Sequence, residues 1–422
     1  MQYGCIGEHL PHSFSKIIHE KIETYDYILK ELTPDEVIPF MQSKDFSGIN
    51  VTIPYKQTVI PFLDEIDEMA NDIGAVNTVV NRNGKLYGYN TDFAGLSALI
   101  EKIGISLANK KVLIIGTGGT AKTAKAVAKA GGARATIQMS RSQKEGAVLY
   151  REAYEKHRDA EIVINTSPCG MFPNLDGFPS DENQNPFDFD AFPLLEGAVD
   201  VVYNPLRTRF VLEAQKRGLR AEGGLYMLVA QAVFAAGHFT GKDYPKSLID
   251  DIFSSLVAEK ENIVLIGMPS SGKSTLAGIL ANTMNRNTVD TDDEIIKTIN
   301  MPIADYFTQK SEAAFRDVES NVIHHLADKT QCVIATGGGA ILKDQNVDAL
   351  KQNGRLYFLD RALDDLLPTD SRPLSSSKEA IRQRYEERYD RYQAVADVII
   401  KNFSSPEETA NEIAEKHLKT LR

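Results

Sequence analysis

The sequence predicts an α/β protein with parallel sheets and at least two domains, and three observations carry this prediction. Short apolar runs alternate with helical patterns along the chain, as they do where helices connect parallel strands. At two places, 116–121 and 267–274, a glycine-rich turn separates a strand-like run from a helical pattern. The length of 422 residues gives room for two or three domains, each with its own hydrophobic core.

The predicted elements fall into three blocks. The first block, residues 1 to about 90, has strands at 3–7 and 48–53 among helical patterns. The second begins near residue 110 and has strands at 111–115, 135–139, 162–165 and 198–203, with helices at 121–130, 226–239 and 247–258. Pro, Asn and Asp residues between 172 and 193 predict a long loop. The third block starts after a very short linker near Lys260.

Composition narrows the classes of partner. The net charge of −11 argues against nucleic acid, because binding to a phosphate backbone needs a basic face. It also repels anionic substrates, so local lysine and arginine side chains have to hold them. No apolar run approaches the about 18 residues of a membrane-spanning helix. The first residues lack the features of a secretion signal, so we expect a cytoplasmic protein without a membrane partner.

The first glycine-rich turn predicts a dinucleotide site. The segment Gly116-Thr-Gly-Gly-Thr-Ala121 follows a strand and opens a helix, so Gly116, Gly118, Gly119 and Ala121 fit a turn that lets backbone approach a pyrophosphate. The next strand ends in Ser140-Arg141-Ser142, about 25 residues on, where the ribose-reading residue is expected. Arg141 suits a 2′-phosphate and favours NADP over NAD, and Lys122 adds positive charge. An exposed surface arginine is the alternative interpretation.

The second glycine-rich turn predicts an ATP and Mg²⁺ site. The segment Gly267-Met-Pro-Ser-Ser-Gly-Lys-Ser274 follows the apolar run 263–266 and precedes a helix, as in a P-loop. Its backbone N–H groups would hold phosphates, Lys273 would reach the β- and γ-phosphates, and Ser274 would hold Mg²⁺. The predicted ATP-binding residues of this turn are Gly267, Ser270, Ser271, Gly272, Lys273, Ser274 and Thr275.

Residues 1–258 resemble shikimate dehydrogenase in six ordered motifs. These are Gly7-Glu-His-Leu-Pro-His-Ser13-Phe-Ser15, Gly48-Ile-Asn-Val-Thr-Ile-Pro-Tyr-Lys56, Gly74-Ala-Val-Asn77-Thr, Tyr89-Asn-Thr-Asp92, Asn165-Thr-Ser-Pro-Cys-Gly-Met171 and Gly224-Leu-Tyr-Met-Leu-Val-Ala-Gln231. The resemblance implies an α/β substrate domain over 1–90, to which 225–258 return, and a Rossmann-like NADP domain over 91–224. It also implies reduction of 3-dehydroshikimate to shikimate with NADPH.

The same resemblance implies roles for individual residues. Lys56 and Asp92 would form the proton-transfer pair, and Ser13 and Ser15 would hold the substrate carboxylate. Other contacts implied with the substrate or cofactor involve Thr52, Asn77, Tyr203, Gln231, Ser140, Ser142 and Gly224. Taken singly, the pair Lys56 and Asp92 could also be a surface ion pair, and Asn77 could be a turn former. Ser140 stands where the family often has Asn, which leaves the contact with adenine open.

Residues 261–422 resemble shikimate kinase, which implies a parallel α/β domain of the P-loop NTPase type. Beyond the P-loop, the motifs are Val289-Asp290-Thr-Asp292-Asp-Glu-Ile, Phe315-Arg316-Asp-Val-Glu319, Thr336-Gly337-Gly338-Gly339, Arg372-Pro-Leu374 and Arg388-Tyr-Asp-Arg-Tyr392 before Val395-Ala-Asp397. Side chains repeat every two residues along a strand, so an extended strand would put Asp290 and Asp292 on one side. One of them would then serve Mg²⁺ and the other the accepting hydroxyl. The resemblance implies that Asp292 contacts the substrate hydroxyls, which leaves Asp290 for Mg²⁺.

The kinase resemblance also implies a pocket for a carboxylated substrate. Arg316 and Arg388 would hold the carboxylate, and Gly337, Gly338 and Gly339 would let backbone approach the ring. Arg372 would reach ATP phosphates from a closing lid, although the lid 364–372 is short and acidic. The family's proline is missing from the motif at 388–392, so either Arg388 or Arg391 could be the arginine that holds the carboxylate. The spacing to Tyr392 favours Arg388.

Together these features predict a bifunctional enzyme of aromatic amino acid biosynthesis. NADPH would reduce 3-dehydroshikimate, and ATP would then phosphorylate the shikimate formed to shikimate 3-phosphate. A quinate/shikimate dehydrogenase that uses NAD is one alternative for the first half. A metabolite-sensing module without turnover is another alternative for either half. The sequence leaves the oligomeric state open.

Overall fold

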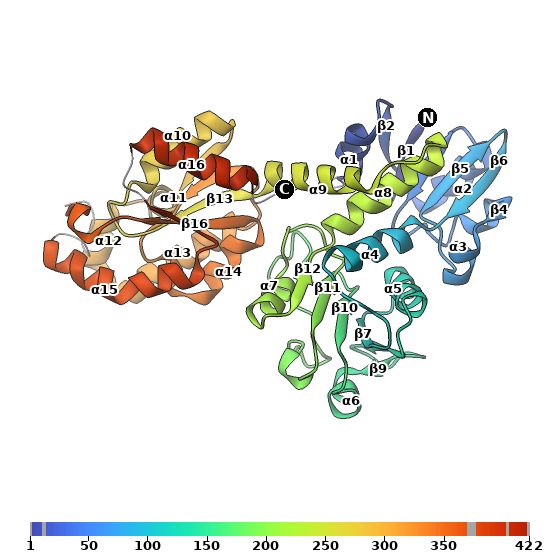
Figure 1. Cartoon of the computed structure of the whole chain (residues 1–422), viewed down its shortest axis with the longest axis horizontal. Coiled ribbons are helices and arrows are strands. Elements are labelled where there is room, and N and C mark those ends of the chain that lie inside the picture. Colours follow the sequence, from blue (N-terminus) through green and yellow to red (C-terminus); the bar gives the residue numbers. More distant parts are fainter. Residues whose placement is uncertain (1, 11–13, 369–376, 402–404, 420–422) are drawn as a thin grey trace. The chain divides into compact units, whose positions relative to one another are not determined.

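The computed structural model describes residues 2–10, 14–368, 377–401 and 405–419, which form two compact units (Figure 1). The first unit comprises Met1–Asn204 and Thr208–Phe253, and the second comprises Pro205–Arg207 and Ser254–Arg422. Across the described residues, no helix has the length and apolar character that a bilayer crossing requires.

The first unit begins with a mixed six-stranded sheet of order β2-β1-β3-β5-β6-β4. Its strands β1 and β3 are parallel, whereas β5 runs antiparallel to both β3 and β6. Asn83 and Gly84 turn the chain between β5 and β6 with positive φ angles of 55° and 85°, which these residue types tolerate. The strands are β1 (Tyr3–Gly7), β2 (Tyr27–Glu31), β3 (Gly48–Val51), β4 (Glu65–Ile66), β5 (Thr78–Arg82) and β6 (Lys85–Tyr89).

Three helices accompany this sheet, namely α1 (Ser15–Ile22), α2 (Pro34–Ser43) and α3 (Glu68–Ile73). Fully buried side chains of α2 and the sheet, among them Met41, Ile49 and Leu86, form the hydrophobic core. The strand predicted at 48–53 ends earlier, at Val51. The next residues form turns, and Pro54 has no N–H to donate to a neighbouring strand.

The second sheet of the first unit is entirely parallel, with order β12-β11-β10-β7-β8-β9. Its strands are β7 (Lys111–Ile115), β8 (Ala135–Ser140), β9 (Val148–Leu149), β10 (Ile162–Asn165), β11 (Gly197–Asp200) and β12 (Arg220–Glu222). The helices before and between them are α4 (Thr91–Lys102), α5 (Gly119–Ala130), α6 (Tyr150–Lys156) and α7 (Arg209–Lys216).

Two segments of this region differ in detail from the predictions. The strand predicted at 198–203 ends at Asp200, because the Asp200 carboxylate accepts the Val202 N–H at 3.0 Å and so starts a turn. The loop predicted at 172–193 holds a short 3₁₀ helix, Phe189–Ala191, and buries the rings of Phe187 and Phe192 against the sheet. Burial of these rings fixes the long loop to the core.

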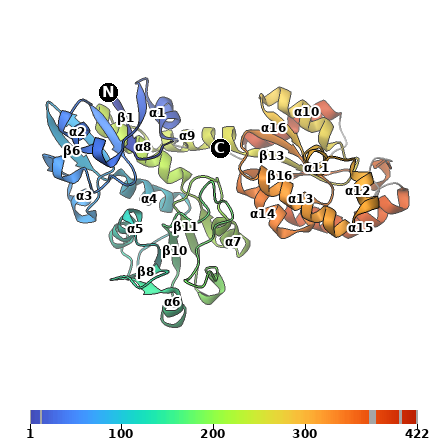
Figure 2. The same cartoon turned by 180° about the vertical axis from the view of Figure 1, so that it is seen from behind.

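Helix α8 (Leu225–Thr240) returns to the first sheet and packs against α1 and α4 (Figures 1 and 2). Eleven of its 16 residues are buried, as expected for a helix that is apolar nearly all round. Gly95 of α4 allows the close approach, since a Cβ there would lie 2.6 Å from the Met227 carbonyl oxygen. Helix α9 (Lys246–Lys260) follows.

The second unit contains a parallel sheet of order β14-β15-β13-β16-β17, with the P-loop strand β13 at its centre. The strands are β13 (Asn262–Ile266), β14 (Asn287–Asp290), β15 (Cys332–Ala335), β16 (Gly354–Asp360) and β17 (Val398–Lys401). The helices are α10 (Lys273–Met284), α11 (Thr291–Ile299), α12 (Ile303–Gln309), α13 (Glu312–Leu326), α14 (Asp344–Gln352), α15 (Lys378–Val395) and α16 (Pro406–Lys419).

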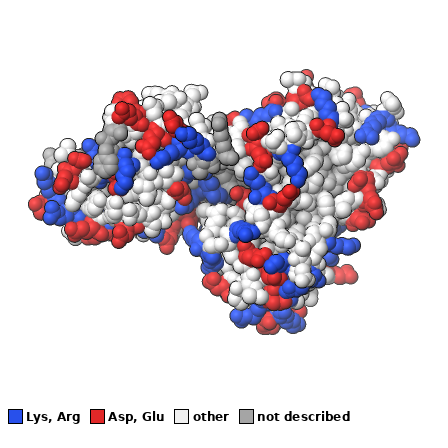
Figure 3. Space-filling model, viewed as in Figure 1, with Lys and Arg blue, Asp and Glu red and all other residues white. Residues whose placement is uncertain are grey.

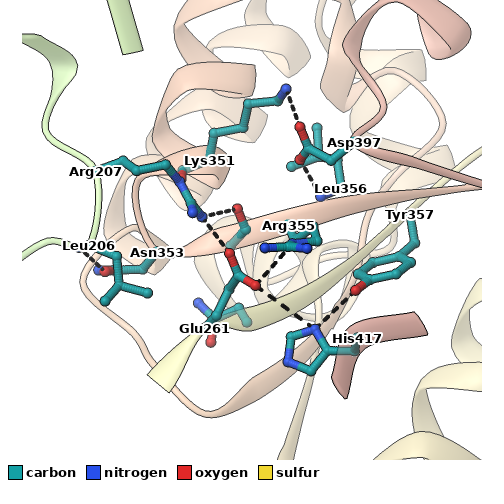
Figure 4. A network of polar contacts seen from close by, with 12 residues as sticks. Leu206, Arg207, Glu261, Lys351, Asn353, Arg355, Leu356, Tyr357, Asp397 and His417 are labelled. Atoms are coloured by element: carbon teal, nitrogen blue, oxygen red, sulfur yellow. Dashed lines mark hydrogen bonds and ion pairs between the residues drawn. The ribbon is translucent and has the colours of Figure 1, made fainter. Parts of the chain in front are cut away.

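A buried carboxylate, Glu261, organises the start of β13 in the second unit (Figure 4). It accepts from Arg207 Nη2 at 2.8 Å and pairs with Arg355 Nε at 3.0 Å. Arg207 also donates to the carbonyl oxygens of Lys351 and Gly354, at 2.9 and 2.8 Å. Two guanidinium groups therefore depend on one carboxylate for their charge balance.

We expect Glu261→Gln to lower the free energy of unfolding of the second unit by about 3 kcal/mol, because it leaves two partly buried guanidinium groups without a counter-charge. Pulse proteolysis in urea, read from peptides of residues 262–401, measures this loss. Glu412→Gln is the control, since its ion pair with Lys416 has side chains 43% and 41% exposed and should contribute less than about 0.5 kcal/mol. Equal losses in the two variants would contradict the prediction.

Charged side chains of both signs mix on the face drawn in Figure 3, where Lys and Arg are interspersed with Asp and Glu. A mixed surface of this kind provides no strong field to draw an anion toward that face. Binding of an anionic ligand therefore depends on local cationic groups within a site.

Candidate active sites

The first unit contains a cavity of about 940 Å³ at the carboxyl ends of β7, β8, β10 and β11. This volume is ordinary for a small-molecule site, and in open parallel sheets such sites lie at this edge. The predicted residues that line it are Ser15, Thr52, Lys56, Asn77, Asp92, Gly116, Gly118, Gly119, Lys122, Ser140, Arg141, Ser142, Tyr203, Gly224 and Gln231. Ser13 lies outside the described residues. Ala121 is buried within α5 and is not part of the lining.

Lys56 and Asp92 form an ion pair in the wall of this cavity. Lys56 Nζ lies 2.6 Å from Asp92 Oδ2, and the two side chains are 20% and 12% exposed. Asp92 stands in the first turn of α4, where a negative charge is favoured by the helix dipole. Asn90 caps the same helix by accepting the Phe93 N–H. The arrangement holds a proton donor beside a fixed carboxylate at the edge of the cavity.

A buried set of polar groups connects two further predicted residues. Asn77 Oδ1 accepts the Thr91 N–H at 2.7 Å, and Asn77 Nδ2 donates to Thr91 Oγ1 at 3.0 Å. Thr91 Oγ1 in turn donates to Gln231 Oε1 at 3.4 Å. Sequence reasoning did not single out Thr91, although it stands inside the motif at 89–92. Its contacts fix the direction in which Asn77 presents its amide.

Tyr203 reaches the cavity from the segment after β11. Its ring lies 5.5 Å from that of Phe14, and burial raises the pKa of its hydroxyl. The phenol therefore stays neutral and can donate or accept a hydrogen bond. Gly224 approaches the same segment so closely that a Cβ would lie 2.1 Å from the Val201 carbonyl oxygen, which only glycine permits.

The other part of the cavity fits a dinucleotide. Gly116 has a φ of +112°, and a Cβ there would lie 2.7 Å from Thr166 Oγ1. Gly118 and Gly119 instead face open space at the start of α5, where backbone N–H groups are available to a phosphate. Arg141 supplies positive charge from the end of β8.

Lys144 is a further cation of this region that sequence reasoning missed. It lines the cavity, and its Nζ donates to Thr117 Oγ1 at 2.9 Å. Its position three residues after Arg141 was the feature of the sequence that could have indicated a place in this site. With Lys122 and Arg141 it gives the dinucleotide end three basic residues.

The second unit places the P-loop between β13 and α10 as predicted. Gly267, Ser270 and Gly272 have φ angles of 149°, 64° and 93°, which curl the loop so that its N–H groups converge. Lys273 is buried and donates from Nζ to the carbonyl oxygens of Gly267 and Met268, at 2.9 and 2.8 Å. Ser271 is buried, whereas Thr275 is exposed on α10.

Ser274 and Asp290, the two predicted Mg²⁺ ligands, contact each other directly. Ser274 Oγ donates to Asp290 Oδ2 at 2.6 Å. A hydroxyl beside a carboxylate at the end of a P-loop is an oxygen donor set suited to Mg²⁺. The residues of the loop therefore fit the phosphates and the metal ion that the sequence predicted.

The prediction that Asp290 and Asp292 share one face of an extended strand is wrong. Strand β14 ends at Asp290, and helix α11 begins at Thr291. Asp290 caps that helix by accepting the Asp292 N–H at 2.9 Å, a role for which aspartate is strongly favoured. Asp292 still lies near the predicted glycines, because a Cβ on Gly337 would come within 2.8 Å of its Oδ1.

Arg316 stands beside the glycine segment 337–339 in a partly buried ion-pair cluster. Its guanidinium pairs with Glu319 Oε2 at 2.7 Å and with Glu312 Oε1 at 3.1 Å. A Cβ on Gly339 would lie 1.9 Å from Arg316 Nη1, so a larger residue there would displace the guanidinium. Burial raises the pKa of Glu319, and Arg316 opposes that rise. Glu319 was part of the quoted motif, but sequence reasoning assigned it no role.

The two competing arginines of α15 have different neighbours. Arg388 is buried and donates to the Gly338 carbonyl oxygen at 3.1 Å. Arg391 instead donates to the Ile341 carbonyl oxygen and pairs with Asp344. Arg388 is therefore the one that contacts the glycine segment. Arg372 lies outside the described residues.

Comparison with known proteins bears on both units. A family model described as shikimate dehydrogenase substrate binding domain matches residues 5–79, and one described as shikimate kinase matches residues 269–421. The shikimate dehydrogenase (NADP(+)) of Clostridium perfringens strain ATCC 13124 is 32% identical over 271 residues, which are 60% of this chain and 97% of that protein.

Solved structures give the same likeness for the first unit. A chorismate mutase/shikimate 5-dehydrogenase fusion protein from Clostridium acetobutylicum aligns with a TM-score of 0.55 and 31% identity over 60% of this chain and 96% of that one. Shikimate 5-dehydrogenase from Thermus thermophilus, in complex with NADP(H) and shikimate, aligns with a TM-score of 0.53 and 26% identity over 60% and 99% of the two chains.

Proposed function

Since the chain belongs to the shikimate dehydrogenase family and carries a shikimate kinase domain after it, we propose that it catalyses two consecutive reactions on one small molecule. It is a bifunctional shikimate-pathway enzyme that uses NADP, ATP and Mg²⁺. In the proposed order, 3-dehydroshikimate is reduced to shikimate, and shikimate is then phosphorylated to shikimate 3-phosphate. The domains proposed are 1–90 with 225–258 for the substrate, 91–224 for NADP, and 261–422 for the kinase.

The observation that carries the first reaction is the ion pair of Lys56 and Asp92, which opens into the same cavity as the glycine-rich turn at 116–121. NADPH, when bound, supplies the hydride. Lys56 would donate a proton to the carbonyl oxygen of the substrate, and Asp92 would keep the ammonium charged and oriented. Reduction of a ketone needs both transfers at one carbonyl, so one cavity has to hold both groups.

The remaining polar residues of this cavity would bind the ring. Asn77, held by Thr91, would direct its amide to a substrate hydroxyl, and Gln231 and Thr52 would contact others. Ser15 would donate to the substrate carboxylate. Ser13 is proposed for the same role from its motif alone. Tyr203 would border both the ring and the nicotinamide.

The kinase half would work mainly by positioning and charge neutralisation. Lys273 and the P-loop N–H groups would hold the phosphates, and Ser274 and Asp290 would hold Mg²⁺. Asp292 would orient the accepting hydroxyl and take its proton. Arg316 and Arg388 would hold the carboxylate next to the glycine segment 337–339. ATP, when bound, supplies the phosphoryl group.

A coupled assay with purified full-length protein tests this proposal. We expect 3-dehydroshikimate with NADPH to yield shikimate, and the addition of ATP and Mg²⁺ to convert it to shikimate 3-phosphate. If no shikimate forms, the first half is a sensing module without turnover. If shikimate forms but is not phosphorylated, the second half is the module without turnover.

Cofactor choice is tested at Arg141. We expect Arg141→Ala to raise KM for NADPH about 10- to 100-fold, because a charged hydrogen-bond partner of the 2′-phosphate contributes about 1.5–3 kcal/mol, and to leave KM for NADH nearly unchanged. Steady-state rates with each cofactor measure this. The control is Arg151→Ala, whose side chain is 86% exposed on α6. Wild-type protein that prefers NADH would instead support the quinate/shikimate alternative.

A further inference from the structure

Asp200 is a fully buried carboxylate at the carboxyl end of β11. Its Oδ1 accepts from Asn165 Nδ2 and from the Val202 N–H, each at 3.0 Å. Its Oδ2 accepts from Thr208 Oγ1 at 2.6 Å. Thr208 is also the N-cap of α7, where it accepts the Val211 N–H. One carboxylate thus joins three separate segments of the first unit.

The chain of hydrogen bonds continues into the loop after β10. Asn165 stands directly opposite Asp200 in the parallel register. Its Oδ1 accepts from Ser167 N at 3.1 Å and from Ser167 Oγ at 2.7 Å. Because the Asn165 amide is held by Asp200 on one side and holds Ser167 on the other, the carboxylate sets the position of this loop.

Two of the segments joined by Asp200 line the cavity. These are residues 166–169, which follow β10, and residues 201–203, which follow β11. Thr166 donates to the Ile115 carbonyl oxygen, next to the first glycine of the dinucleotide turn. Tyr203 lies against Phe14, which precedes α1. A cofactor that reaches from the glycine turn to Lys56 would therefore run alongside both segments.

We propose that Asp200 is a positioning residue that holds residues 166–169 and 201–203 at a fixed separation, and so sets the place of the nicotinamide ring against the substrate carbonyl. This inference rests on the proposed dehydrogenase function of the cavity. Asp200 itself is buried and is not part of the cavity lining, so it acts through Asn165, Ser167 and Val202.

The burial of Asp200 supports this role, because burying a charged carboxylate is unfavourable. Burial raises the pKa of Asp200 to about 7, and the hydrogen bonds from Thr208, Val202 and Asn165 oppose that rise. Apolar side chains would join two strands without this penalty. A polar group kept in such a place provides directional contacts that apolar packing does not.

The experiment compares Asp200→Ala with wild type in the NADPH-dependent reduction, using NADPH deuterated at the transferred hydrogen. We expect kcat to fall about 10²-fold, the loss that a displacement of about 1 Å produces between reacting groups. The isotope effect on kcat should rise, because hydride transfer becomes slower than product release. KM for 3-dehydroshikimate should stay within about threefold, because the residues proposed to bind its hydroxyls and its carboxylate lie on other elements.

Val199→Ala is the matched control, since Val199 is a fully buried neighbour in β11 that does not line the cavity. It should lower stability and leave kcat and the isotope effect unchanged. If Asp200→Ala does not fold, Asp200→Asn decides, and it should show a smaller fall in kcat with a raised isotope effect. Wild-type kinetics in the folded Asp200 variant, or an equal loss in Val199→Ala, would overturn the proposal. Failure of wild-type protein to reduce 3-dehydroshikimate would overturn the proposed function instead.

Discussion

Lys56→Ala should lower kcat/KM for reduction of 3-dehydroshikimate about 10³-fold, within the range that a positioned proton donor contributes. The variant loses the group 2.6 Å from Asp92 and leaves that carboxylate facing the substrate carbonyl without a cation. The carbonyl oxygen then receives no proton from Lys56, and the negative charge that develops on it is not neutralised. Steady-state kinetics with NADPH measures the loss.

Two comparisons make this result specific. The kinase activity of the same protein sample should be unchanged, because Lys56 belongs to the first unit. Lys102→Ala in α4 serves as the matched control, since its side chain is 44% exposed and pairs with Asp250 away from the cavity lining. A Lys56→Ala variant that keeps a tenth of the wild-type rate would contradict the proposed proton donor.

Lys273→Ala should impair the kinase reaction and not the dehydrogenase reaction. We expect the rate of shikimate phosphorylation to fall about 10²- to 10³-fold, the loss typical of removing one hydrogen-bond donor to the charge that develops in the transition state. In the structure Lys273 Nζ binds the carbonyl oxygens of Gly267 and Met268, so it is held within the loop that would take the phosphates. Its ammonium would neutralise charge on the transferred phosphoryl group. The measurement is the rate of shikimate 3-phosphate formation at saturating ATP and Mg²⁺.

The reduction of 3-dehydroshikimate by Lys273→Ala should equal that of wild type. Lys297→Ala is the control in the same unit, because its side chain is 70% exposed on α11 and pairs with Glu294, three residues away. Loss of both activities in Lys273→Ala would indicate a general failure of folding. Retention of kinase activity would exclude the P-loop as the ATP site.

Features that depend on a few consecutive residues were predicted correctly from the sequence. Both glycine-rich turns lie between a strand and a helix, at 116–118 and 267–272. Gly116 and Gly267 adopt positive φ angles, which is a property of the local backbone and of glycine itself. Arg141 directly follows β8, as predicted from its place after the strand-like run 135–139.

The error at Asp290 and Asp292 shows where local reasoning is insufficient. Their spacing of two residues fits one face of a strand, but it fits equally a helix cap followed by an acidic first turn. The choice depends on where β14 stops pairing with β15, and that register ends at Asp290. Pairing with a neighbouring strand is a tertiary property, so the motif alone did not determine it.

The sequence by itself determined that two nucleotide-binding α/β units follow one another and which residue types each unit offers for catalysis. Only the tertiary structure decided which of them meet. It brought Asp92 to Lys56 across 36 positions and Gln231 to Thr91 across 140 positions. It also revealed Thr91, Lys144 and Asp200, which contact residues of other segments. Local motifs are read from neighbouring residues, whereas the position of a side chain in a site depends on the packing of elements far apart in the chain.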